Sequence, residues 1–141
     1  SLPYVSQIVH FRGKKLLDGG CSDRIPLKAF EKLGFDRNIV ISTQPREHKV
    51  KDRDAYLARF FYRKYPRFCE TFARSPQTYE ETQNEMDEAS RTGRAFIIRP
   101  QTSLGIKRLT HNPDDVQRGY DAGMRDAQAL IPQLNAWLNS D

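Results

Sequence analysis

The sequence predicts an α/β fold in which a short β-hairpin and two further core strands are flanked by helices. Strand-like runs, most of them largely apolar, occur at residues 8–11, 14–17, 38–43 and 95–100. Longer stretches between them carry apolar residues at helical spacing, with Ser, Asn, Pro and Gly at their ends. A chain of 141 residues, of which 38% are hydrophobic, can bury the core of one domain. We therefore expect residues 1–141 to belong to a single domain.

The first two apolar runs predict a β-hairpin, because Arg12 and Gly13 separate them as a two-residue turn. The second run ends in Asp18, which Gly19 and Gly20 follow directly. Glycine tolerates a positive φ and has no Cβ, so we expect this pair to turn the chain and leave space beside the carboxylate. By local sequence alone, Asp18 starts a turn, as Asp-Gly pairs commonly do.

A helix is expected after the glycines, with Ser22 or Asp23 as its N-cap and Gly34 at its end. The run at 38–43 is apolar almost throughout, which is typical of a strand covered on both faces. Together with the strand that ends at residue 17, these elements predict a βαβ unit with a right-handed crossover.

Three more helices are predicted from apolar spacing. The first is expected to end at Pro66, with an inner face of Tyr56, Leu57, Phe60 and Phe61. The second runs from residue 75 to residue 92, with an inner face of Tyr79, Gln83, Met86 and Ala89 and five solvated acidic residues between 80 and 88. The third follows Asn112, with an inner face of Val116, Tyr120, Met124 and Ala127. Pro132 is expected to kink or restart this helix.

The whole net charge of +5 lies in residues 46–74, which hold nine Lys and Arg against four Asp and Glu. The rest of the chain is balanced at fourteen of each sign. A localised excess of positive charge indicates an anionic partner. Cations and aromatic rings alternate within this segment, and Arg59, Arg63, Lys64 and Arg67 are the candidate contacts for an anionic surface.

Three interpretations of this basic segment stay open. Rings and cations together can stack single-stranded bases and neutralise phosphates. A basic amphipathic helix can lie on an anionic membrane surface. The third interpretation is an ordinary helix whose rings are in the core and whose cations are solvated.

Several classes of site find no support in the sequence. Neither Gly-x-Ser-x-Gly nor a phosphate-binding glycine motif occurs. His10, His48 and His111 have no partners at metal-ligand spacing, so we expect no metal and no cofactor. Cys21 and Cys69 are too few for a disulfide framework, and no apolar run is long enough to cross a membrane. A cytoplasmic location is therefore expected.

Residues 15–27 resemble the second catalytic block of the patatin-like phospholipases. In that family Asp-Gly-Gly or Asp-Gly-Ala follows a hairpin and precedes a helix with a start like Ile25-Pro26. The chain downstream is also similar to bacterial members, because its strands, prolines and helices follow in the same order. The positions that carry this similarity are Pro45 after a strand, Tyr79 and Glu80 in a helix, the strand 96–100 and the pair Tyr120 and Gly123 in the last helix.

The resemblance implies a three-layer α/β/α fold and a serine-aspartate dyad. Asp18 would be the general base, Gly19 and Gly20 the motif glycines, and the substrate a lipid or another ester. The family places its glycine-rich loop and its Gly-x-Ser-x-Gly serine before this aspartate. We therefore expect residues 1–141 to be the C-terminal part of such a domain, inactive without the N-terminal half, cytoplasmic and peripheral to the membrane.

The alternative function is a non-enzymatic module that binds an anionic membrane or nucleic acid through residues 46–74. Nucleic acid is the less expected partner. Strong and steeply salt-dependent binding of DNA would favour the alternative, because released counterions dominate such binding.

Overall fold

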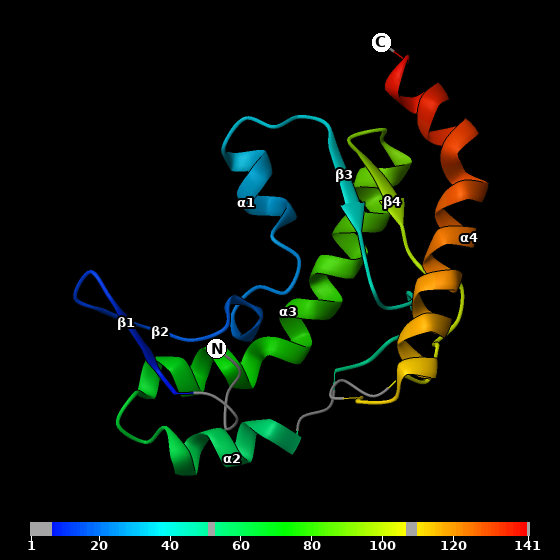
Figure 1. Cartoon of the computed structure of the whole chain (residues 1–141). Helices are drawn as coiled ribbons and strands as arrows, with labels where there is room; N and C mark the ends of the chain where they lie inside the picture. Colours follow the sequence, from blue (N-terminus) through cyan, green and yellow to red (C-terminus); the bar gives the residue numbers. More distant parts are fainter. Residues whose placement is uncertain (1–6, 51–52, 107–109, 141) are drawn as a thin grey trace. The chain divides into compact units, whose positions relative to one another are not determined.

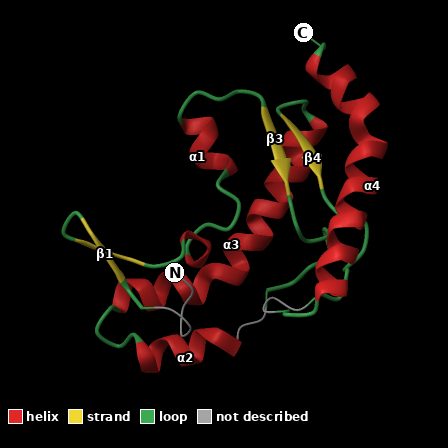
Figure 2. Cartoon of the chain, viewed as in Figure 1, coloured by secondary structure: helices red, strands yellow, loops and turns green. Residues whose placement is uncertain are grey.

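Helices and short strands follow one another in a computed structural model that describes residues 7–50, 53–106 and 110–140 (Figure 1). The elements are β1 (Val9–Phe11), β2 (Lys14–Leu16), the 3₁₀ helix η1 (Gly19–Cys21), α1 (Leu27–Lys32), β3 (Asn38–Ile41), α2 (Arg53–Phe61), α3 (Pro66–Arg91), β4 (Ala95–Ile98) and α4 (Pro113–Leu138). Helices account for most of the ordered backbone, and the strands form small sheets (Figure 2). The predicted mixture of α and β structure is confirmed.

Contacts divide the chain into two compact units. The first unit is Ser1–Pro26 with Lys49–Thr82, and the second is Leu27–His48 with Gln83–Asp141. Helix α3 passes from the first unit into the second. The assignment of residues 1–141 to part of one domain stays a prediction.

The hairpin of the first unit forms as predicted. Strands β1 and β2 pair antiparallel, with Phe11 opposite Lys14. The turn between them has φ of 46° at Arg12 and 71° at Gly13. Two positive φ angles suit the right-handed twist of a two-residue hairpin.

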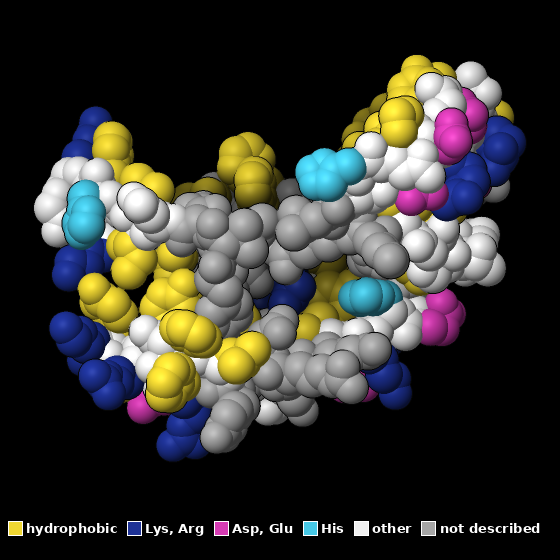
Figure 3. Space-filling model, turned by 60° about the horizontal axis from the view of Figure 1, so that its bottom comes forward, with side chains coloured by type: hydrophobic (Ala, Val, Ile, Leu, Met, Phe, Trp, Pro, Cys, Tyr) yellow, Lys and Arg dark blue, Asp and Glu magenta, His cyan; other side chains and the backbone are white. Residues whose placement is uncertain are grey.

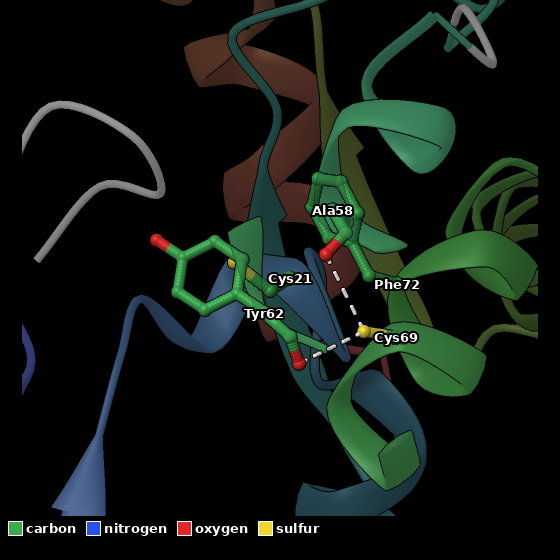
Figure 4. Packing of buried hydrophobic residues seen from close by; sticks show 5 residues of the cluster. All are labelled: Cys21, Ala58, Tyr62, Cys69 and Phe72. Carbon is green, nitrogen blue, oxygen red and sulfur yellow. Dashed lines mark hydrogen bonds between the residues drawn. The ribbon is translucent and has the colours of Figure 1, made fainter. Parts of the chain in front are cut away.

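The core of the first unit is a cluster in which η1, α2 and α3 meet (Figure 4). Its buried members are Cys21, Ala58, Tyr62, Cys69 and Phe72. The Cys69 thiol donates to the carbonyl oxygens of Ala58 and Tyr62, at 3.4 and 3.3 Å. Neither Cys21 nor Cys69 forms a disulfide, and both buried thiols fill space in this core.

The predicted inner face of α2 is wrong. Phe60 and Phe61 are 71% and 64% exposed, whereas Ala58 is completely buried. The small Ala58 side chain lets α2 lie close to α3, and Tyr62 follows one turn later on the same side. The helix also ends at Phe61 rather than at Pro66. The side chain of Tyr56 lies outside the described residues.

Helix α3 begins at Pro66, because a proline suits the first turn, where its missing N–H costs nothing. The predicted start near residue 75 is therefore wrong, and Pro76 lies inside a continuous helix. An internal proline costs a helix about 3 kcal/mol, which packing on both sides of Pro76 must outweigh. The predicted inner face is confirmed: buried residues are Tyr79, Gln83, Met86 and Ala89. Gly93 has a φ of 76° just beyond the end of the helix.

The sheet of the second unit consists of β3 and β4, which pair parallel from Asn38 opposite Ala95 to Ile41 opposite Ile98. The predicted βαβ unit is wrong, because β2 pairs with β1 and, within the described residues, β3 pairs only with β4. The expectation that the strand at 38–43 is covered on both faces is wrong for the described residues, because Ile39 and Ile41 of β3 are exposed, whereas Ala95 of β4 is buried. Among the elements of this unit, α1 contacts β3 and α4 contacts β4.

Helix α4 starts after Asn112 as predicted, and the Asn112 side chain accepts a hydrogen bond from the Asp114 N–H. Its predicted inner face is wrong, since Tyr120 is 63% exposed while Ala122 is buried. The helix also continues unbroken through Pro132. The helix is held near its C-terminal end by Trp137, whose indole N–H donates to the Gly93 carbonyl oxygen at 3.0 Å and whose ring lies 4.2 Å from the Arg37 guanidinium.

Candidate functional site

Asp18 lies just beyond the end of β2, where it caps the short helix η1. Its Oδ1 accepts a hydrogen bond from the Gly20 N–H at 2.8 Å, and the side chain is half-buried. Leu17 on one side and Cys21 on the other pack into the core cluster of the first unit. Packing of Leu17 before it and Cys21 after it therefore fixes the position of the backbone that carries the Asp18 carboxylate.

The two motif glycines keep space beside this carboxylate, but not through a positive φ. Neither Gly19 nor Gly20 uses the positive φ that glycine permits, and both lie in the 3₁₀ turn of η1. A Cβ on Gly20 would lie 3.2 Å from Asp18 Oδ1, and a Cβ on Gly19 would meet nothing within 4 Å. Gly20 thus permits the hydrogen bond, and Gly19 leaves open space.

The second carboxylate oxygen of Asp18 is available for chemistry. Within the described residues, no donor bonds to Oδ2. Two cations near it in the sequence have other partners, since Lys15 donates to the Tyr65 hydroxyl at 3.2 Å and Arg24 to the Ser75 hydroxyl at 3.3 Å. A carboxylate with one oxygen held and the other open can accept a proton from a hydroxyl group.

The four basic residues singled out in the sequence are all exposed: Arg59, Arg63, Lys64 and Arg67. Arg59 and Arg63 line one groove of about 390 Å³ between α2 and the start of α3, together with Glu70. Lys64 and Arg67 are not part of its wall. In the part of the chain that the structure describes, none of the four forms an ion pair.

A network of charged side chains in the second unit was missed by the sequence reasoning, which treated the acids of α3 as solvated. Asp87 accepts from Arg99 at 2.7 Å and from Arg46 at 2.5 Å. Burial alone would raise the pKa of Asp87, but the hydrogen bonds and charges of Arg99 and Arg46 outweigh it and lower that pKa below 3.8. The sequence carries one signal of this network, because Arg46 follows the run at 38–43 and Arg99 follows the apolar residues 95–98.

Replacing Asp87 by Asn is expected to lower the free energy of unfolding by about 1–2 kcal/mol at neutral pH. The lowered pKa in the folded state means that the Asp87 carboxylate stabilises the fold above its ordinary pKa of 3.8. This contribution is lost as the pH falls through the lower, folded-state pKa. Urea unfolding of both proteins across acidic pH should therefore show their difference shrinking below about pH 4. A constant difference would contradict the ionic origin of the effect.

A pocket of about 470 Å³ opens at the carboxyl ends of β3 and β4, where ligands of parallel sheets usually bind. Its wall is mostly apolar and includes Ile41, Ile98 and Ile106, with Arg99 and Asp126 among its polar groups. Gly119 allows α4 to approach this wall, because a Cβ there would lie 2.9 Å from Ile106. The pair Gly119 and Gly123, four residues apart in the last helix, is the sequence signal for this close approach.

The described ranges contain neither a metal site nor a membrane-spanning helix. No group of three or more His, Cys, Asp and Glu side chains there could hold a metal ion. None of the helices formed by these residues combines the length and the apolar character needed to cross a membrane.

Known proteins offer one point of comparison. No curated protein and no solved structure matches the chain. A family described as "Domain of unknown function (DUF6363)" matches residues 65–139, which contain α3, β4 and α4. Asp18, Arg59 and Arg63 precede the matched range. Since the match covers more than half of the sequence, the chain belongs to the DUF6363 family.

Proposed function

We propose that this chain is the C-terminal part of a patatin-like lipid acyl hydrolase. Asp18 is its general base, and an upstream part of the same domain provides the nucleophilic serine. The proposal is supported by the resemblance of residues 15–27 to the catalytic block of that family. The enzyme acts on lipids or other carboxylic esters, in the cytoplasm and at the periphery of the membrane.

The observation that carries the proposal is the state of the Asp18 carboxylate. Its Oδ1 is held by the Gly20 N–H, while its Oδ2 has no donor among the described residues. A structural Asp-Gly turn needs only the first of these features. The open space at Gly19 adds room for a substrate beside the second oxygen.

The reaction needs one proton acceptor at this position. As the serine Oγ attacks the ester carbonyl carbon, its proton passes to Oδ2 of Asp18. Protonated Asp18 then gives this proton to the departing alcohol, and an acyl-serine ester remains. Water attacks the acyl carbon of this ester and gives a proton to Asp18. Asp18 passes that proton to the serine Oγ as the bond between the acyl carbon and Oγ breaks, which releases the carboxylic acid and restores the serine hydroxyl. Asp18 therefore transfers protons both when the acyl-serine ester forms and when it is hydrolysed.

The second unit supports the existence of a further part of the domain. Its parallel sheet has only two strands in the described residues, whereas parallel sheets are normally larger and covered on both faces. Ile39 and Ile41 of β3 are nevertheless 47% and 73% exposed, and Leu33, just after α1, is 73% exposed. An N-terminal half of a three-layer α/β/α fold would cover such surfaces.

Adding the upstream half as a separate chain tests the proposal. Hydrolysis of a short p-nitrophenyl ester is expected to rise and saturate as the half that contains Gly-x-Ser-x-Gly is titrated into residues 1–141. Neither chain should hydrolyse the ester alone. Activity of residues 1–141 alone would contradict the claim that the nucleophile lies elsewhere.

The second candidate function is a non-enzymatic module that binds an anionic partner through residues 46–74. It is favoured by Arg59, Arg63, Lys64 and Arg67, which are exposed and form no ion pair with another described residue. A titration without hydrolysis, in which the two halves nevertheless form a complex, would favour this candidate over the hydrolase.

A further inference from the structure

We propose that the outer side of α2 and the turn after it dock onto an anionic lipid surface. The docking surface consists of Leu57, Arg59, Phe60, Phe61, Arg63 and Lys64, and is called the α2 surface below. It is argued from exposure and charge, and does not rest on the proposed hydrolase activity.

The apolar part of the α2 surface is more exposed than large apolar side chains usually are. Phe60 is 71% exposed, Phe61 64% and Leu57 44%. The two rings contact each other edge to face, with centroids 5.4 Å apart. Contiguous exposed apolar groups mark a site of contact with a partner or a membrane.

The basic part lies beside it and lacks acidic partners. Residues 57–74 hold five Lys and Arg and one acid, Glu70. Arg59, Arg63 and Lys64 are exposed, and none of them takes part in an ion pair with another described residue. The ion pairs found among the described residues all belong to the second unit. Among the described residues, the cations of the α2 surface are therefore not neutralised by ion pairs, which favours an anionic partner.

The helix keeps the two kinds of side chain together. Ala58 and Tyr62 form its buried side, so residues at other angles around the helix face outward. At about 100° per residue, Arg59, Phe60, Leu57 and Phe61 follow one another around the outer side of α2, and Arg63 lies in the turn just after the helix. At the left of the face in Figure 3, hydrophobic and basic side chains lie next to each other.

A lipid surface fits this composition better than nucleic acid does. Single-stranded bases stack on the open faces of aromatic rings, whereas here the edge of one ring meets the face of the other. Leu57 offers no stacking at all, yet an aliphatic side chain is readily accommodated between acyl chains. Apolar groups bordered by cations are the pattern of helices that lie in the interface of an anionic membrane.

A headgroup site adjoins this surface. Arg59 and Arg63 both line the groove of about 390 Å³ beside the start of α3. Guanidinium groups bind phosphate oxygens with paired hydrogen bonds, so a lipid phosphate can bind there while the Phe rings enter the acyl region. Glu70, on the same wall, is expected to oppose the phosphate.

The α2 surface and Asp18 belong to the same compact unit, so docking of this surface would also bring Asp18 to the membrane. Leu17 and Cys21 flank Asp18 and pack into the same cluster as Ala58 and Tyr62 of the buried side of α2. Binding of the α2 surface to a membrane would therefore attach to it the same unit that carries the Asp18 carboxylate.

Co-sedimentation of the full chain with lipid vesicles tests the proposal. Binding is expected to vesicles of phosphatidylcholine mixed with phosphatidylglycerol, to weaken as salt is raised, and to be far weaker with phosphatidylcholine alone. Arg59→Gln with Arg63→Gln should weaken binding about 30-fold. Phe60→Ser with Phe61→Ser should weaken it about 100-fold. Glu70→Gln should strengthen it.

Matched control variants lie in the second unit. Lys32→Gln with Arg125→Gln removes two other exposed cations, and Leu33→Ser with Ile41→Ser removes two apolar side chains that are each 73% exposed. Both controls should bind vesicles like the unaltered chain. Circular dichroism and urea midpoints confirm that each variant is folded.

Three outcomes would overturn the proposal: equal binding to both kinds of vesicle, equal losses in α2 variants and controls, or tighter binding of a single-stranded oligonucleotide that the same α2 variants abolish. The last outcome would assign the surface to nucleic acid. If the two-half protein does not hydrolyse the ester while residues 1–141 bind anionic vesicles as expected, only the proposed enzymatic function is contradicted.

Discussion

Replacing Asp18 by Asn is expected to lower ester hydrolysis by the reconstituted two-half protein about 10²–10⁴-fold, the range that a general base contributes. Asn retains an amide oxygen that can accept the Gly20 N–H, so the turn and the stability should be unchanged. The amide cannot take up the proton of the serine. Steady-state kinetics with a p-nitrophenyl ester, together with urea unfolding, measure the two effects separately.

Asp23 provides the matched control for this experiment. Its Oδ1 accepts a hydrogen bond from the Ile25 N–H, two residues on, at 3.2 Å, which is the same local arrangement as at Asp18. Asp23→Asn should therefore leave hydrolysis unchanged. Equal activity in the Asp18 and Asp23 variants would show that Asp18 is only a turn residue.

Replacing Phe72 by Ala is expected to destabilise the protein by about 3–5 kcal/mol, since a large buried ring is lost and a cavity remains. Phe72 is 9% exposed and stacks on Phe68, with ring centroids 5.6 Å apart. Urea unfolding, followed by circular dichroism, measures the loss.

Phe60→Ala removes the same side chain from the outer side of α2, where 71% of the residue is exposed. We expect a change within about 0.5 kcal/mol, as is usual at the surface. A large destabilisation by Phe60→Ala, with a small one by Phe72→Ala, would restore the inner face predicted from the sequence.

The contrast between Phe72 of α3, which is buried, and Phe60 of α2, which is exposed, shows the limit of prediction from the sequence. Tyr56, Leu57, Phe60 and Phe61 are the most apolar residues at helical spacing, so the pattern favoured them as the core. The structure instead buries Ala58, the smallest side chain of the segment, because close approach to α3 depends on it. Helix α4 likewise buries a small side chain, Ala122, and exposes a large one, Tyr120.

Some features of the candidate site could likewise be predicted from the sequence, and others could not. The turn at Asp18 and its two glycines could be recognised, since a side chain bonding an N–H two residues on is a local event. The ion pairs of Asp87 could not, because they join residues 41 and 12 positions away in the chain. The pocket at the ends of β3 and β4 likewise depends on a parallel pairing between distant strands.

Local features were therefore readable in the sequence: the hairpin at Arg12 and Gly13, the inner face of α3, the helix end at Gly93 and the cap at Asn112. Each depends on φ preferences, caps or spacing within a few residues. Packing alone decided which strands pair and which faces of α2 and α4 are buried. The continuity of α3 through Pro76 was decided in the same way. In these cases contacts between distant residues outweigh local preferences, which differ by only a few kcal/mol.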